Sequence, residues 1–332
     1  MEILATGVQR DERPLLEAAV TPRHQIRCVE PALTPDTLPL AAGFEAVSTS
    51  VDAVLDAPVL EALVRGGTRL VTQRSTGYNN IDLDHAERLG LTVTRVADYS
   101  PYSVAEFAWT LATALNRRIE RSARRTRDLD FRLDGLLGRD FHGRTAGVIG
   151  TGRIGTAFTA IARGFGMRLL GWDITPNPAC EELGMEYVEL DRLCREADLI
   201  SLHVPLMPST HHLLGERRLA EMKDDVILVN TGRGALIDSA ALTAALQAGR
   251  LGGVGLDRYE EEAGVFFYDK ALEVMTEETL TRLTAFGNVL VTSHQAYFTV
   301  DAVRQIATAT VRNVDDYLAG RITECTLVPK SP

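Results

Sequence analysis

The chain has 332 residues, of which 45% are hydrophobic and 24% charged, and this is enough for two globular domains with cores of their own. Acidic residues outnumber basic ones by 45 to 35, and the net charge of −10 argues against nucleic acid or acidic lipid as a partner. The sequence has no run of about 18 apolar residues and begins without the basic and apolar regions of a signal peptide, so we expect a cytoplasmic protein.

The cysteines stand far apart, with no CxxC pair and no ligand-like pairing with histidine. They are Cys28, Cys180, Cys194 and Cys325. Scattered thiols in a chain of this size indicate a reducing compartment rather than a disulfide framework or a zinc site. The one basic cluster holds six arginines between Arg117 and Arg127, interleaved with acidic residues. We interpret it as a solvated helix face or a subunit contact.

Short apolar runs alternate with helical patterns along the chain, which predicts βαβ units and parallel sheets. In the first hundred residues the predicted strands are Ile3–Ala5, Ile26–Val29, Ala46–Val51, Arg69–Thr72 and Thr92–Val96, with helical patterns at Val59–Arg65 and Asp84–Leu89. A stronger helix follows Pro101, and the last helix covers about Val303–Leu318. Between these two helices six further strands are predicted, as in a complete dinucleotide-binding sheet: Ala146–Ile149, Arg168–Trp172, Leu199–Leu202, Val226–Val229, Gly253–Leu256 and Val289–Val291.

A GxGxxG motif covers Gly150 to Gly155, with its other glycine at Gly152. It follows a predicted strand and opens a predicted helix, and the next strand ends at Asp173, which together form a dinucleotide fingerprint. The glycines let the backbone approach a pyrophosphate at the helix N-terminus, and Asp173 would accept hydrogen bonds from the adenine-ribose hydroxyls. A carboxylate here repels the 2′-phosphate of NADP, and Ile174 supplies no compensating cation, so we predict NAD as the cofactor.

Three chemically active residues each follow a predicted strand: Arg233, Glu262 and His294. The carboxyl ends of parallel strands meet at one edge of a sheet, so a cation, a carboxylate and an imidazole are expected to gather there. Taken singly, each residue has a structural explanation: a salt bridge for the arginine, a satisfied polar residue for the histidine and a solvated acidic turn for the glutamate.

Seven separated motifs decide between these explanations. They are Arg74–Asn80, Tyr99–Glu106, Gly150–Gly155, Ser201–Pro205, Asn230–Asp238, Asp257–Gly264 and Ser293–Thr299. With them the chain resembles the D-isomer-specific 2-hydroxyacid dehydrogenases over nearly its full length, most closely the D-lactate dehydrogenase branch.

The resemblance implies an α/β fold with two doubly wound parallel-sheet domains. A flavodoxin-like substrate domain would comprise residues 1–100 and 297–332, and a Rossmann NAD-binding domain residues 101–296, with the active site in the cleft and a homodimer built from the NAD domains. Besides the glycines, the implied cofactor contacts are Arg153, Ile154, Asp173, Val204, Pro205, Thr210, Thr231 and Asp257. Backbone amides of Thr76 and Gly77 would hold the substrate carboxylate, with Tyr99 beside it.

The implied activity is the NADH-dependent reduction of pyruvate to D-lactate. Arg233 would hold the carboxylate in a bidentate fork, and His294 would give a proton to the ketone oxygen. We expect Glu262 to pair with His294 and raise its pKa, so that oxidation of the hydroxyacid, which needs the neutral imidazole, prefers a higher pH than reduction.

Alternatives remain within and outside this activity. The substrate could be another 2-oxo acid, such as phenylpyruvate, a branched 2-oxo acid or hydroxypyruvate, and a protein of this fold could also be an NAD-sensing, corepressor-like scaffold. No metal is expected. His203 lies in a cofactor-loop motif, and the adjacent His211 and His212 cannot both point one way on a regular element.

Overall fold

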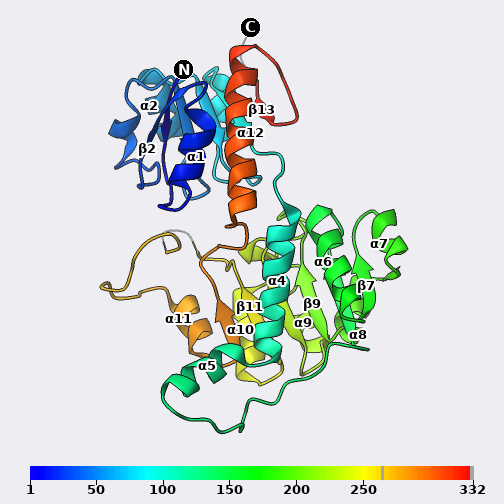
Figure 1. The fold of residues 1–332 in the computed structure, drawn as a ribbon. Helices are drawn as coiled ribbons and strands as arrows, with labels where there is room; N and C mark the ends of the chain where they lie inside the picture. The colour runs from blue at the N-terminus through cyan, green and yellow to red at the C-terminus, as the bar shows by residue number, and fades with distance from the viewer. Residues whose placement is uncertain (263–264, 330–332) are drawn as a thin grey trace. The chain divides into compact units, whose positions relative to one another are not determined.

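The computed structural model describes residues 1–262 and 265–329, so Ala263 and Gly264 of the Asp257–Gly264 motif lie outside the described residues. The chain divides into two compact units (Figure 1). Unit 1 is Met1–Ser100 with Phe298–Pro332, and unit 2 is Pro101–Tyr297. Across the described residues no helix is long and apolar enough to span a bilayer.

Unit 1 contains a sheet with the strand order β13-β5-β4-β3-β1-β2. Its strands are β1 (Glu2–Ala5), β2 (Gln25–Cys28), β3 (Ala46–Thr49), β4 (Leu70–Gln73), β5 (Thr92–Arg95) and β13 (Thr326–Val328). Its helices are α1 (Arg13–Val20), α2 (Ala57–Arg65), α3 (Leu83–Arg88) and α12 (Val300–Leu318), with the 3-10 helix η1 (Leu38–Ala41). All pairs are parallel except β13 with β5, which is antiparallel.

Unit 2 contains an all-parallel sheet with the strand order β12-β11-β10-β9-β6-β7-β8. Its strands are β6 (Thr145–Ile149), β7 (Arg168–Trp172), β8 (Met185–Tyr187), β9 (Leu199–Leu202), β10 (Ile227–Asn230), β11 (Gly253–Leu256) and β12 (Val289–Val291). Its helices are α4 (Pro101–Asn116), α5 (Ile119–Arg127), α6 (Arg153–Gly164), α7 (Pro178–Glu182), α8 (Leu190–Glu196), α9 (Glu216–Glu221), α10 (Ser239–Gln247) and α11 (Glu278–Ala285), with η2 (Gly234–Leu236). The strand order reverses at β6, and ligands of doubly wound sheets bind at such a switch point.

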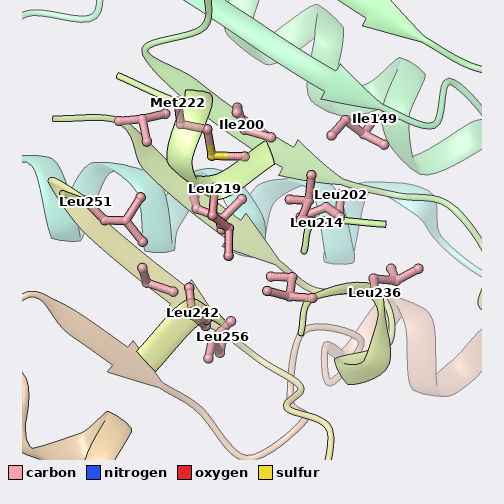
Figure 2. Packing of buried hydrophobic residues seen from close by; sticks show 14 of the residues in the cluster. Ile149, Ile200, Leu202, Leu214, Leu219, Met222, Leu236, Leu242, Leu251 and Leu256 are labelled. Carbon is pink, nitrogen blue, oxygen red and sulfur yellow. The ribbon is translucent and has the colours of Figure 1, made fainter. Parts of the chain in front are cut away.

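Both faces of the unit 2 sheet are buried, because alternate residues of each strand point to opposite faces. On one face Ile200 and Leu202 of β9 pack with Leu219, Met222 and the neighbouring apolar side chains of α9 and α10 (Figure 2). On the other face the remaining strand residues pack against α4 and α6. This double burial explains why the strands are continuous apolar runs rather than alternating patterns.

The structure confirms the predicted fold class of two parallel-sheet α/β units and adds elements that the sequence did not reveal. The short edge strand β8 was missed because only Met185 of its three residues is buried. The antiparallel edge strand β13 makes the unit 1 sheet mixed. Four of the six clustered arginines lie in α5, which has no buried residue, as expected for a solvated helix face.

Candidate active site

The glycine motif forms the turn between β6 and α6. Gly150 has a φ of 94°, and a Cβ at this position would lie 2.6 Å from the carbonyl carbon of His203. A Cβ on Gly155 would overlap the carbonyl oxygen of Gly150, so neither position can carry a side chain. A Cβ on Gly152 would instead meet nothing within 4 Å, and this residue caps α6 without a side-chain hydrogen bond. The N–H groups that open α6 therefore face an unobstructed position suited to a phosphate.

Asp173 lies directly after β7 and contacts this turn. One carboxylate oxygen accepts hydrogen bonds from the backbone N–H of Thr151 (2.6 Å) and from its hydroxyl (3.1 Å), and the other accepts one from Ile174 N–H (2.7 Å). These bonds hold a negative charge beside the glycine turn, where the fingerprint requires a partner for ribose hydroxyls. The next residue is Ile174, which carries no positive charge to bind a 2′-phosphate. This agrees with NAD rather than NADP as the cofactor.

The other expected cofactor residues of the sheet edge follow β9 and β10. Thr210 closes the loop after β9, because its hydroxyl donates to Pro205 O (2.7 Å) and accepts from Met207 N–H (2.8 Å), and Val204 is buried in the same loop. The Thr231 hydroxyl, after β10, is buried without a hydrogen-bond partner among the described residues. A buried orphan hydroxyl and an uncapped helix N-terminus are features that a bound dinucleotide would satisfy, so these residues fit NAD. Arg153 and Ile154, the first two residues of α6, lie at the same helix end.

Arg233 lies in the loop between β10 and η2, and two neighbours fix this loop. The side chain of Asn230 accepts from Gly232 N–H (3.0 Å) and donates to Arg233 O (2.9 Å). A Cβ on Gly234 would overlap the backbone of Tyr259 and Glu260, so glycine permits the loop after β10 to lie against the turn after β11. Asn230 and Gly234 both belong to the Asn230–Asp238 motif, but neither side chain carries catalytic chemistry that would single it out in the sequence.

Glu262, Arg258 and His294 form a hydrogen-bonded group in which the arginine stands between the other two. Arg258 lies 2.5 Å from Oε1 of Glu262, and its other terminal nitrogen lies 2.8 Å from Nε2 of His294. Arg258 and Glu262 are four residues apart in one turn after β11, whereas His294 follows β12, the next strand of the sheet. Glu262 and His294 therefore lie at adjacent strand ends, and both contact a guanidinium that the sequence did not point to.

The expectation that Glu262 raises the pKa of His294 is wrong for this structure. Burial, followed by the positive charges of Arg258 and Arg233, lowers the pKa of His294 well below its ordinary value. Burial also raises the pKa of Glu262, against the opposing effects of Arg258 and Arg233. The error arose because Glu262 was assigned to the imidazole directly, whereas its described ion pair is with Arg258.

His294 is held in place by its backbone and by aromatic neighbours. It has a φ of 57°, an uncommon backbone conformation for a residue other than glycine, and its N–H donates to Asp257 O (3.0 Å). The rings of Phe267 and Tyr297 lie 5.4 and 6.0 Å from its ring. The carboxylate of Asp257 accepts hydrogen bonds from Thr292, Gln295 and Ala296 of this loop, and its contact with the cofactor stays a prediction.

Thr76, Gly77 and Tyr99 belong to unit 1. Arg95 donates to Thr76 O (2.7 Å), and Ser75 donates through its hydroxyl to Gly77 O (2.6 Å), so the backbone of this loop is fixed through its carbonyl groups. The preceding Arg74 is buried and bound to Glu12 (2.9 Å), which gives this motif arginine a structural role. Tyr99 lies between β5 and α4.

The histidine pair shows a second difference from the sequence argument. His211 and His212 stack with ring centroids 3.9 Å apart, and their Nε2 atoms lie 3.9 and 2.7 Å from Oε1 of Glu260. His212 has a φ of 50°, so the chain turns between the two residues and both rings face one carboxylate. Within the described ranges these three form the one group of metal-ligand type. The His212–Glu260 hydrogen bond accounts for their approach, and the absence of a metal stays a prediction.

The sheet with its switch point, the glycine turn and the acid after β7 define a dinucleotide-binding α/β protein. The residues at the ends of β10, β11 and β12 include side chains that are able to exchange protons. Residues 109–296 match the family model of the D-isomer specific 2-hydroxyacid dehydrogenase NAD-binding domain. The chain belongs to this family of dehydrogenases, and NAD is its cofactor.

Individual relatives agree with the family model. A D-lactate dehydrogenase of Escherichia coli is 48% identical over 87% of this chain and 88% of its own length. The D-lactate dehydrogenase kk1H of Curvularia clavata is 46% identical over 93% of this chain and 88% of its own length. The solved apo-structure of the Escherichia coli D-lactate dehydrogenase covers 99% of this chain and 100% of its own, with a TM-score of 0.91 and 41% identity.

Proposed function

We propose that this protein reduces pyruvate to D-lactate with NADH. The observation that carries the proposal is geometric. Arg233, Glu262 and His294 follow β10, β11 and β12, which are neighbours in the sheet, and Arg258 contacts both Glu262 and His294. The similarity to two D-lactate dehydrogenases over most of the chain supports the choice of substrate.

Each group has one role in this proposal. The planar guanidinium of Arg233 binds the carboxylate of the 2-oxo acid and fixes the ketone next to it. NADH, when bound, supplies the hydride to the ketone carbon. His294 donates the proton that the ketone oxygen then requires, and neutral His294 accepts that proton in the reverse direction. Glu262 bears the negative charge that offsets the guanidinium groups around the imidazole.

The unit assignment follows from the same residues. Unit 2 carries the cofactor turn and the acid/base group, and unit 1, which carries Thr76, Gly77 and Tyr99, is the substrate domain in this proposal. The backbone N–H groups of Thr76 and Gly77 would bind the substrate carboxylate.

A homodimer is also part of the proposal. The segment after α5 exposes a series of large apolar side chains to more than two-thirds of their maximum. They are Leu129 (77%), Phe131 (70%), Leu133 (81%) and Leu137 (92%). Apolar residues gathered on one exposed segment mark a protein interaction surface. We expect light scattering to give twice the chain mass, and a monomeric mass at working concentration would exclude this part of the proposal.

Four free thiols support a reducing, cytoplasmic location.

The enzymatic proposal is tested by following NADH absorbance with pyruvate, phenylpyruvate, a branched 2-oxo acid and hydroxypyruvate, and by chiral separation of the product. The expected result is the highest kcat/KM with pyruvate and formation of D-lactate. His294→Gln should lower kcat by about 10²–10⁴-fold, because general acid catalysis contributes that much. His85→Gln is the matched control, since His85 also contacts a glutamate (Glu61, 3.2 Å) but lies in α3. Wild-type protein that binds NADH and turns over none of these acids would refute the proposal and favour a purely binding role.

A further inference from the structure

Arg258 contacts both partners of the acid/base centre, and its chemistry fixes their state. A guanidinium has only donors and stays protonated, so Nε2 of His294, 2.8 Å away, must accept its hydrogen bond. An imidazole nitrogen that accepts carries no proton. His294 is therefore neutral in this arrangement, with its proton on Nδ1, and Nε2 has no proton to donate to a ketone.

The same arrangement leaves a complementary pair of atoms unsatisfied. Nδ1 of His294 is buried and has no hydrogen-bond partner within the described part of the chain, and the same holds for Oε2 of Glu262. Leaving a buried polar atom without a hydrogen-bond partner destabilises the arrangement that contains it. One of these atoms is a donor and the other an acceptor, and Arg258 contacts both side chains to which they belong. A direct bond between Glu262 and His294 would satisfy both atoms.

We propose that Arg258 is a positioning residue that holds the acid/base centre in a resting state. In this state its guanidinium binds Nε2 of His294 and Oε1 of Glu262. Catalysis requires the guanidinium to release Nε2. This inference rests on the proposed function, because it assigns a role within the acid/base centre. On release, Nε2 becomes available to take up the proton that reduction consumes, and Glu262 becomes available to the imidazole. Arg258 thereby determines when His294 can work as an acid.

The charged and titratable groups around His294 come from three loops. Arg233 follows β10, Arg258 and Glu262 follow β11, and Tyr297 lies in the loop of His294 itself. Arg233 stays in place when Arg258 is replaced, so burial and one cation continue to oppose protonation. Removing Arg258 takes away the second cation and the donor at Nε2, and frees the charge of Glu262. Every one of these changes favours the protonated imidazole.

The first test measures His294 without any substrate, by NMR titration of the histidine ring nitrogens, with the His294 signals identified from their loss in His294→Gln. In the wild-type protein we expect a neutral ring with the proton on Nδ1 that does not titrate around pH 6.5. In Arg258→Met we expect the titration to move up by at least one pH unit. Arg258→Lys keeps a cation and should titrate as the wild type does. A wild-type ring with its proton on Nε2, or an unchanged titration in Arg258→Met, would overturn the proposal.

The second test uses turnover and separates positioning from mere structural support. In Arg258→Met the kcat/KM for reduction at pH 8 should be about tenfold higher than in the wild type, because a titration that moves up by one pH unit gives a tenfold larger protonated fraction at that pH. A structural role alone would lower kcat equally at all pH values. Arg282→Met is the matched control: it removes an i,i+4 arginine–glutamate pair with Glu278 on α11. If the wild type turned over no 2-oxo acid, the proposed function would fail, while the NMR result would still decide the role of Arg258.

Discussion

Oδ2 of Asp257 accepts a hydrogen bond of 2.8 Å from the backbone N–H of Ala296. Its Oδ1 accepts two more, from Gln295 N–H (2.8 Å) and the Thr292 hydroxyl (2.7 Å). Asp257 is fully buried at the end of β11, so one carboxylate fixes the loop after the adjacent strand β12. That loop carries His294 in its uncommon backbone conformation.

Asp257→Ala should therefore damage both stability and catalysis. The change leaves three donors without their acceptor, and we expect the free energy of unfolding to fall by roughly 2–5 kcal/mol, as measured by urea unfolding. The kcat should fall by at least tenfold because His294 loses its support. Asp224→Ala is the control, since Asp224 is exposed and pairs with Arg250 at the surface. Wild-type stability in Asp257→Ala would show that this carboxylate does not hold the loop.

Gly234→Ala tests how the loop of Arg233 lies against the turn of Arg258 and Glu262. The added methyl group would overlap the backbone of Tyr259 and Glu260, so the two loops must separate. We expect the KM for pyruvate to rise by about tenfold or more and the melting temperature to fall. Gly287→Ala is the matched control, because a Cβ there meets nothing within 4 Å. Equal kinetics for the two variants would contradict the described loop contact.

Asp173 should determine the choice between NADH and NADPH. Its carboxylate lies beside the glycine turn, where a 2′-phosphate would meet a like charge at a cost of several kcal/mol. The wild type should therefore show at least a hundredfold higher kcat/KM with NADH. Asp173→Asn keeps the shape and the acceptor oxygen but removes the charge, and should lower this preference by about tenfold. A wild type that uses NADPH as well as NADH would refute the assignment.

The parallel strands were predictable because burial of both sheet faces favours apolar residues at most strand positions, and this produces runs that stand out in the sequence. Arg168–Trp172, Leu199–Leu202 and Gly253–Leu256 were predicted with the bounds that the structure has. Two edge strands, β8 and β13, lack this signal: β8 has one buried residue, and β13 pairs antiparallel with β5, which is distant in sequence.

The sequence predicts where the residues of the candidate site lie, but not which side chains form hydrogen bonds with one another. Residues that follow parallel strands must gather at one sheet edge, so Arg233, Glu262 and His294 could be grouped from the sequence. Which side chain bonds to which depends on side-chain directions within the turn after β11, and Arg258 lies only four residues before Glu262. The sequence alone could not show that this guanidinium comes between the two partners. The sequence also could not show the positive φ of His212. This backbone conformation lets the adjacent rings of His211 and His212 both face Glu260.

His203 should make the folded state sensitive to acid. Its half-buried ring is bonded to Ser201 (2.9 Å) and packed on Phe158, and desolvation lowers its pKa from 6.5 to about 3. The unfolded chain takes up a proton near pH 6.5 and the folded chain does not, so this contribution to stability is present above pH 6.5 and is lost as the pH falls towards 3. One such group changes the free energy of unfolding by up to about 1.4 kcal/mol per pH unit. In urea unfolding at pH 7 and pH 5, His203→Gln should be less stable than the wild type at pH 7 and should lose less stability on acidification. An equal loss in both proteins would contradict the assignment.

The lowered pKa of His294 predicts opposite pH requirements for the two directions of the reaction. Reduction needs the protonated ring, and in the free protein burial and the adjacent guanidinium groups keep that form scarce at neutral pH. The kcat/KM for reduction of pyruvate should therefore increase as the pH falls below 7, approaching tenfold per pH unit until the lowered pKa is reached. Oxidation of D-lactate needs the neutral ring, so its kcat/KM should stay level over the same range and fall only below that pKa. The two profiles are measured from initial rates in buffers of constant ionic strength, with His85→Gln as a control that should reproduce both. Superimposable profiles for the two directions would show that His294 does not transfer the proton.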